Sequence, residues 1–250
     1  MTNKLFLGDS LKIMEDIEDE SVDMIATDPP YGMSYQGNYS NSINVFRKIE
    51  NDDNLDWLEP FVKESYRIAK PNTAHYMFCS WHKVDVFKQV LQKYFTVKNL
   101  LVWLKKGHSA GDLEGDFTPQ FELIFFFTKG RRIMRGRRDG NLLPFNKILK
   151  GRSHPTEKPV ALMQYLISKF TEKGETVFDG FMGVGSTGVA AQQIERDFIG
   201  VEIDEEYFTI ANQRINKANQ LALSPEFLEE RATDNESMKW FEAEQRRIVL

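Results

Sequence analysis

Residues 176–191 read TVFDGFMGVGSTGVAA, and this stretch decides the fold class. A short β-rich run enters a glycine loop, and a run of small residues that suits a helix leaves it. The glycines Gly183, Gly185 and Gly188 fit the pattern G-x-G-x-x-G, in which backbone N–H groups approach a ligand at the N-terminus of a helix. The pattern predicts a nucleotide-type pocket in an α/β protein, and dinucleotide dehydrogenases share it.

The next strand-like run ends in an acid. Residues 198–202 read FIGVE, and Glu202 lies 17 residues after Gly185. A carboxylate at that place binds ribose hydroxyls in folds of this kind. The alternative is an acid that only faces solvent at the end of a strand. The glycine loop before it favours the ribose interpretation.

A second motif, Asp28-Pro29-Pro30-Tyr31, follows the apolar run at residues 22–27, which predicts a buried strand. The prolines fix their own φ angles and bias the preceding residue toward extended geometry. A carboxylate and a main-chain carbonyl at such a turn could accept both hydrogens of an exocyclic amino group, while the tyrosine covers the ring. The structural alternative is a proline turn in which Asp28 is a cap.

Together the two motifs resemble the amino-methyltransferases of DNA that use S-adenosylmethionine, with a D/N/S-P-P-Y/F/W catalytic turn and an F-x-G-x-G cofactor loop. The catalytic turn precedes the cofactor loop by about 150 residues. This order is similar to that of the β group, which methylates adenine N6 or cytosine N4. Residues 154–159, HPTEKP, also look like the segment before the cofactor loop in that group. The resemblance spans roughly residues 4–217, and Gly180 departs from it, since many relatives have proline there.

The resemblance implies a Rossmann-like methyltransferase fold, an α/β, doubly wound, mostly parallel seven-stranded sheet with one antiparallel strand. The alternation of strand-like and helix-like segments also argues for a doubly wound parallel sheet. Two runs joined by a glycine-rich loop without a helix, 97–103 and 121–128, suggest one antiparallel hairpin. The strand candidates are residues 4–7, 22–27, 73–79, 97–103, 121–128, 176–179 and 198–202.

The resemblance further implies roles for individual residues. The methyl group would transfer directly to a flipped-out base held by the catalytic turn, without a covalent intermediate or a metal. Asp9 matches an acid that lines the pocket in relatives, although a helix N-cap explains it equally well. The implied catalytic residues are Asp28, Pro29, Pro30 and Tyr31. The implied residues for S-adenosylmethionine are Asp9, Thr156, Lys158, Asp179, Phe181, Gly183, Gly185, Ser186, Thr187 and Glu202, of which Thr156 and Lys158 would bind the methionine carboxylate.

The expected product is N6-methyladenine in DNA, because Asp at position 28 with Tyr at position 31 is the commoner adenine pattern. Three alternatives stay open. Cytosine-N4 enzymes more often carry Ser at the position of Asp28, and enzymes acting on RNA or protein amides usually carry Asn there. A nicotinamide-dependent reductase would use the glycine loop but would leave residues 28–31 unexplained.

The net charge of −5 conceals a basic segment. Residues 129–152 contain nine Lys or Arg and one Asp, a local charge of +8 that leaves −13 for the rest of the chain. A basic segment on an acidic body is expected where phosphate contacts are confined to one face, and a solvated basic loop is the alternative. The predicted partner is double-stranded DNA, contacted by Arg131, Arg132, Arg135, Arg137, Arg138, Lys147, Lys150 and Arg152.

The composition of the chain limits the cellular compartments in which the protein is expected. The single cysteine, Cys79, excludes an intrachain disulfide and a multi-thiolate metal site, which suits a reducing compartment. No basic-plus-apolar leader opens the chain, and no run approaches the ~18 apolar residues of a membrane span. We expect a cytoplasmic protein of a prokaryote or phage without membrane contact, and the sequence leaves a homodimer open.

The length of 250 residues suits one α/β domain with insertions. We expect a methyltransferase domain over residues 1–220. It comprises a catalytic half (1–128), a basic target-recognition insertion (129–152) and a cofactor half (153–220). An acidic extension (221–250) follows. Two long loops, 32–54 and 105–119, are candidates for a lid or for contact with bases.

Overall fold

An eight-stranded sheet forms the centre of the protein in the computed structural model, which describes residues 1–32, 54–105, 115, 117–146 and 157–222. The strand order is β1-β8-β7-β2-β3-β5-β4-β6. The strands are β1 (Asn3–Leu7), β2 (Met24–Thr27), β3 (Thr73–Cys79), β4 (Thr96–Leu104), β5 (Phe121–Lys129), β6 (Leu142–Pro144), β7 (Thr176–Asp179) and β8 (Asp197–Glu202).

Strand direction confirms the expected doubly wound, mostly parallel fold. Strand β5 pairs antiparallel with β3 and with β4, and the other neighbouring strands pair parallel. The predicted hairpin of 97–103 with 121–128 is therefore confirmed as β4 and β5.

The predicted number of seven strands is wrong by one. Strand β6 pairs parallel with the end of β4 and lies within the basic segment 129–152. Three residues that end in proline are too short to show an alternating pattern, so the sequence did not reveal this strand. Part of the segment predicted as an insertion thus belongs to the sheet.

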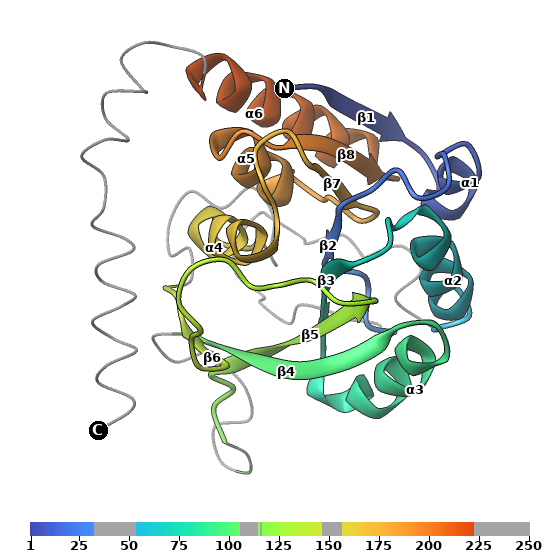
Figure 1. Ribbon diagram of the computed structural model, residues 1–250, viewed down its shortest axis with the longest axis vertical. Helices are drawn as coiled ribbons and strands as arrows, with labels where there is room; N and C mark the ends of the chain where they lie inside the picture. The colour runs from blue at the N-terminus through green and yellow to red at the C-terminus, as the bar shows by residue number, and fades with distance from the viewer. Residues whose placement is uncertain (33–53, 106–114, 116, 147–156, 223–250) are drawn as a thin grey trace.

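Helices cover both faces of the sheet (Figure 1), which explains why every residue of β2 and β3 is buried. One face carries α1 (Ser10–Glu15), α2 (Leu58–Ile68) and α3 (Val84–Tyr94). Their apolar side chains pack with Ile25 and Phe178. The other face carries α4 (Val160–Phe170), α5 (Ser186–Gln193) and α6 (Glu205–Ala222), which pack with Met24 and Ala26. Among the described helices, none is both long and apolar enough to cross a bilayer.

The two edges of the sheet differ in what they bring together. The parallel strands β2, β3, β7 and β8 all end at one edge, here called the carboxyl edge. Because β5 runs the other way, its first residues lie at this same edge, with Leu123 opposite Cys79. The opposite edge, here called the amino edge, holds the starts of the parallel strands and the end of β5, where Lys129 lies opposite Thr73.

Candidate active site

The catalytic turn lies at the carboxyl edge, directly after the buried strand β2. Asp28 follows Thr27, and its side chain keeps 21% of its surface exposed. The hydroxyl of Tyr31 donates to Asp28 Oδ1 at 2.5 Å. The Tyr31 ring meets Phe87 of α3 edge-on, with 6.5 Å between ring centroids. The turn therefore presents a carboxylate whose orientation is held by its own tyrosine.

A buried lysine joins this carboxylate to a second acid. Lys158, which comes just before α4, forms an ion pair with Asp28 Oδ2 and lies 3.1 Å from Glu122 Oε2. Its side chain is only 7% exposed, and its ammonium lies 4.9 Å from the centre of the Phe78 ring. Lys105 forms an ion pair with the other carboxylate oxygen of Glu122. The four charged groups alternate in sign, from Lys105 through Glu122 and Lys158 to Asp28.

Burial shapes the protonation of this cluster. It raises the pKa of Asp28 above its usual value, and the positive charge of Lys158 opposes that rise. Burial alone would lower the pKa of Lys158, but the two carboxylates raise it, so its ammonium stays charged. Burial would raise the pKa of Glu122, but Lys158 and Lys105 lower it. The pKa of Tyr31 lies well above its usual value, mainly because of burial, so this residue is a hydrogen-bond donor.

Asp179, at the end of β7, fastens the catalytic turn to the glycine loop. Its Oδ1 accepts hydrogen bonds from the Thr27 hydroxyl at 2.7 Å and from the Phe181 backbone N–H at 3.1 Å. The Thr187 side chain also bonds to this carboxylate. Asp179 is 2% exposed, and burial raises its pKa to about 6. The structure thus gives it protein partners in both motifs, and its contact with a cofactor stays a prediction.

The three glycines of the loop have different surroundings. A side chain on Gly183, which has a φ of +52°, would meet no atom within 4 Å. A Cβ on Gly185 would lie 2.9 Å from Ile215, and one on Gly188 would lie 2.5 Å from the same side chain. Gly183 therefore faces open space, whereas the other two glycines allow α5 to pack closely against α6.

Glu202 is held against the loop from the end of β8. Its Oε2 accepts from the Gly183 N–H at 2.8 Å, and its Oε1 accepts from the N–H groups of Ile203 and Asp204 at 2.9 Å each. Burial raises its pKa, and these hydrogen bonds oppose the rise. The carboxylate predicted to bind a ribose thus lies beside the one loop glycine that faces open space.

Of three further predicted cofactor residues, Asp9 and Phe181 have structural roles, whereas Ser186 does not. Asp9 is the N-cap of α1, since its Oδ1 accepts from the Leu11 N–H at 2.8 Å. The ring of Phe181 packs on Trp57 and Phe61, with centroids 5.1 and 4.9 Å away. Ser186 is buried at the start of α5, and its hydroxyl has no hydrogen-bond partner among the described residues. Thr156 lies outside the described residues.

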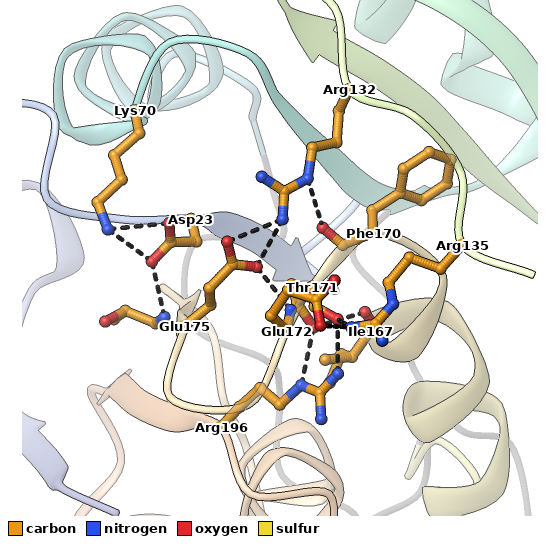
Figure 2. A network of polar contacts seen from close by, with 11 residues as sticks. Asp23, Lys70, Arg132, Arg135, Ile167, Phe170, Thr171, Glu172, Glu175 and Arg196 are labelled. Carbon is orange, nitrogen blue, oxygen red and sulfur yellow. Dashed lines mark hydrogen bonds and ion pairs between the residues drawn. The ribbon is translucent and has the colours of Figure 1, made fainter.

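Two arginines of the basic segment, Arg132 and Arg135, lie at the amino edge beside the residues that precede β7 (Figure 2). Arg132 pairs with both carboxylate oxygens of Glu175 at 2.8 Å and donates to the Phe170 carbonyl. Arg135 donates to the Thr171 carbonyl at 2.7 Å. These contacts give two predicted DNA-binding residues a structural role, so their contact with DNA stays a prediction.

The remaining basic residues divide into two groups. Arg137 and Arg138 are exposed, and the Arg137 carbonyl accepts from Lys169 near the end of α4. Arg131 is exposed and its backbone N–H bonds to Asn72. The other three, Lys147, Lys150 and Arg152, lie outside the described residues, as do most of the loops 32–54 and 105–119 and residues 223–250.

Sequence reasoning missed Glu122 and Lys105 in this site. Glu122 is the second residue of a predicted strand, and a signal for its role existed in the predicted antiparallel hairpin. An antiparallel strand reverses which of its ends meets the carboxyl edge, so its first residues reach the site. No trio of His, Cys, Asp or Glu side chains suited to a metal ion occurs within the described part of the chain.

Comparison with known proteins agrees with this geometry. A family model described as DNA methylase, and named for N6 and N4 methyltransferases, matches residues 22–213. YubD of Escherichia coli (strain K12) is 33% identical over 214 residues, which cover 85% of this chain and 90% of YubD. YhdJ of the same strain, a DNA adenine methyltransferase, is 26% identical over 247 residues, covering 85% of this chain and 82% of YhdJ. The crystal structure of an M1.HpyAVI–SAM complex aligns with a TM-score of 0.68 at 26% identity, covering 86% of this chain and 100% of that one.

Proposed function

Because this chain belongs to the DNA methylase family, we propose that it transfers a methyl group from S-adenosylmethionine to the N6 amino group of adenine in double-stranded DNA. The coarser activity, methylation of DNA at adenine N6 or cytosine N4, follows from the family. The observation that carries the proposal is the placement of the Asp28 carboxylate beside the glycine loop, joined to it through Thr27 and Asp179.

The residues present fit S-adenosylmethionine. The backbone at Gly183 faces open space, and the Glu202 carboxylate beside it can accept hydrogen bonds from two ribose hydroxyls. The Ser186 hydroxyl, buried and without a partner among the described residues, offers a further polar contact at the start of α5. When bound there, S-adenosylmethionine would supply the methyl group from its sulfonium. M1.HpyAVI, whose crystal structure holds SAM, supports this assignment.

The catalytic turn can make an exocyclic amine a better nucleophile. The lone pair of such an amine is delocalised into the ring, so the amine attacks a methyl group poorly until its nitrogen is held pyramidal. Asp28 and the Pro29 carbonyl would accept the two amino hydrogens and favour that geometry. Acceleration would then come from positioning two reactants and from fixed charges near the reacting atoms. The base would have to leave the duplex first, at a cost of a few kcal/mol.

The choice of adenine over cytosine rests on the combination of Asp28 with Tyr31, the commoner adenine pattern, and on the similarity to YhdJ. Cytosine N4 is the second candidate, because the same turn could hold either amino group and the family includes both activities. The family match leaves the nicotinamide-dependent reductase without support. Self-association and a cytoplasmic location stay predictions.

Mass spectrometry of nucleosides tests this proposal. DNA treated with the purified protein and S-adenosylmethionine should contain N6-methyladenine, and DNA treated with an Asp28→Ala variant should not. N4-methylcytosine as the sole product would overturn the choice of base while leaving the family assignment in place. No methylated nucleoside from any duplex tested would contradict the proposed activity itself.

The site at the carboxyl edge also bears on where DNA binds. Arg132 and Arg135 of the basic segment lie at the amino edge, whereas Lys147, Lys150 and Arg152 follow β6 in the sequence, and β6 ends at the carboxyl edge. We therefore expect these three residues to supply most phosphate contacts. Their joint replacement by Gln should reduce the log–log salt slope of DNA binding by up to ~3. Replacing Arg137 and Arg138 is the matched test, and an equal loss of slope there would reverse this assignment.

A further inference from the structure

Glu122 reaches the candidate active site from an unusual direction. It is the second residue of β5, the antiparallel strand, and lies opposite Trp103 of β4. Asp28, by contrast, follows the end of a parallel strand. Their side chains keep similar exposure, 22% for Glu122 and 21% for Asp28, at the same edge of the sheet. Two carboxylates from strands of opposite direction therefore share one buried ammonium, that of Lys158.

The ammonium of Lys158 interacts with the two acids unequally, because it hydrogen-bonds to Asp28 but forms only an ion pair with Glu122 Oε2, which has no hydrogen-bond partner among the described residues. Lys158 contacts Asp28 Oδ2 and lies 3.1 Å from Glu122 Oε2, while Lys105 neutralises the other oxygen of Glu122. The Tyr31 hydroxyl occupies Asp28 Oδ1. Both oxygens of Asp28 thus already accept hydrogen bonds. An entering amino group must therefore compete with Tyr31 and Lys158 for these oxygens.

We propose that Glu122 is a positioning residue for methyl transfer, which draws Lys158 from Asp28 and so frees an Asp28 oxygen for the amino group of the target base. The inference rests on the proposed function. It assigns Glu122 no contact with the base or with the cofactor. Its effect passes through Lys158, which can shift its hydrogen bonds between two carboxylates without moving the backbone.

The charge of Glu122 should change the pKa of Asp28 in a direction that can be tested. Within the described part of the chain, the titratable and charged groups that interact with Asp28 are Lys158, Glu122, Tyr31, Cys79 and Asp179. Among them Glu122 is an acid that the neighbouring lysines keep ionised, and its charge raises the pKa of Asp28. Without that charge, Lys158 would pair with Asp28 alone, and the Asp28 carboxylate would bind protons and amino hydrogens less well.

The test is a pH profile of DNA methylation by a Glu122→Gln variant. Gln keeps the size of the side chain and an acceptor for Lys105 but removes the charge. We expect kcat/KM for DNA to fall by about tenfold. The acid limb of its pH profile, which reports the free protein, should move to lower pH by about one pH unit. Glu122→Asp retains the charge, so its acid limb should stay at the wild-type pH and part of the rate should return.

A matched control removes a carboxylate from the amino edge. Glu175→Gln also takes an acid from an ion pair, with Arg132, but at the amino edge, before the start of β7. It should leave the acid limb unchanged. An acid limb for Glu122→Gln that coincides with the wild type would overturn the proposal. A fall in S-adenosylmethionine affinity equal to the fall in kcat/KM, measured by calorimetry, would also overturn it, because Lys158 would then serve the cofactor.

A second measurement separates this inference from the proposed function. If the wild-type protein methylates no DNA, the proposed function fails, but the coupling of Glu122 to Asp28 can still be measured. Carbon-13 NMR of the Asp28 side-chain carboxyl should give a lower pKa in Glu122→Gln than in the wild type. Equal values would refute the coupling whatever the activity of the protein.

Discussion

The two edges of the sheet hold polar networks that are built differently. At the amino edge, shown in Figure 2, arginines bond to main-chain carbonyls as well as to acids, as Arg196 does with the Thr171 carbonyl at 2.6 Å. The acids there also hold backbone groups, since Asp23 accepts from the Thr176 N–H at 2.9 Å. At the carboxyl edge, Lys158 lies between two side-chain carboxylates, those of Asp28 and Glu122.

This difference indicates that the amino-edge network stabilises the fold and that the carboxyl-edge network serves the reaction. A main-chain carbonyl cannot move without its loop, so the amino-edge network fixes the loops before β2, β7 and β8. A side-chain carboxylate can exchange one partner for another within a rotamer well, so the carboxyl-edge network can admit a substrate. We therefore expect substitutions at the amino edge to change stability and substitutions at the carboxyl edge to change activity.

The strongest test of this division compares two aspartates that flank β2. Asp28→Ala should lose at least ~100-fold in methyl transfer, because it removes the acceptor aimed at the reacting amine. Its affinity for S-adenosylmethionine should stay near the wild-type value. Single-turnover methylation and calorimetry measure the two effects, and near-normal transfer would refute the catalytic assignment.

Asp23→Ala is the counterpart at the amino edge. Asp23 pairs with Lys70 at 2.8 Å and holds the start of β7. Its loss should lower the free energy of unfolding by about 1–3 kcal/mol, while the transfer rate per folded molecule stays unchanged. If Asp23→Ala lost most of its transfer rate while its free energy of unfolding stayed unchanged, the proposed difference between the two edges would be wrong.

The second prediction concerns Arg196, which is 6% exposed and donates to Thr171 Oγ1 at 3.0 Å and to the Thr171 carbonyl. Arg196→Met should lower the free energy of unfolding by about 2–3 kcal/mol, because charge-assisted hydrogen bonds to a buried carbonyl are lost. Urea denaturation should show a lower midpoint with an unchanged m-value. The exposed Arg137→Met should stay within ~0.5 kcal/mol of the wild type.

The third prediction returns to the carboxyl edge. Glu202→Ala should weaken S-adenosylmethionine binding by about 1–3 kcal/mol, since it removes a charged acceptor for ribose hydroxyls. It also frees the Gly183 N–H from its bond to the carboxylate. Calorimetry with Glu205→Ala, an exposed acid of α6, provides the control. Equal affinities for all three proteins would contradict the assignment of the cofactor site.

The last effect comes from a proton that the chain takes up on unfolding, and it is absent at neutral pH. His75 is fully buried, accepts from the Ile25 N–H at 3.1 Å, and burial lowers its pKa to about 3. The unfolded chain binds this proton near pH 6.5, so stability is complete above that pH and is lost as the pH falls toward 3. The slope attributable to His75 is about 1.4 kcal/mol per pH unit.

Denaturation at several pH values checks this expectation. The free energy of unfolding of a His75→Gln variant should depend less steeply on pH between 3 and 6.5 than that of the wild type. Exposed His82 offers the control, because His82→Gln should keep the wild-type slope. A wild-type slope in the His75 variant would show that the buried imidazole takes up a proton in the folded state.

Local patterns in the sequence determined the elements and the two motifs. The runs at 73–79 and 176–179 were predicted with the bounds that β3 and β7 have, because buried strands are read directly from short apolar runs. Asp28 and Glu202 were predicted at strand ends for the same reason. Antiparallel pairing of 97–103 with 121–128 followed from a connection without a helix.

Only the tertiary structure decided which distant residues meet. Glu122 joins Asp28 because β5 lies beside β3 in reverse direction, and the sequence holds no local mark of that neighbour. Gly180, which departs from the proline of many relatives, is explained by a residue 119 positions earlier in the chain: a Cβ at Gly180 would lie 2.5 Å from the Phe61 ring. The place of β6 in the sheet was likewise decided by its pairing with the end of β4, a neighbour that the local sequence does not indicate. Contacts between elements depend on strand direction and packing, which a pattern along one chain does not contain.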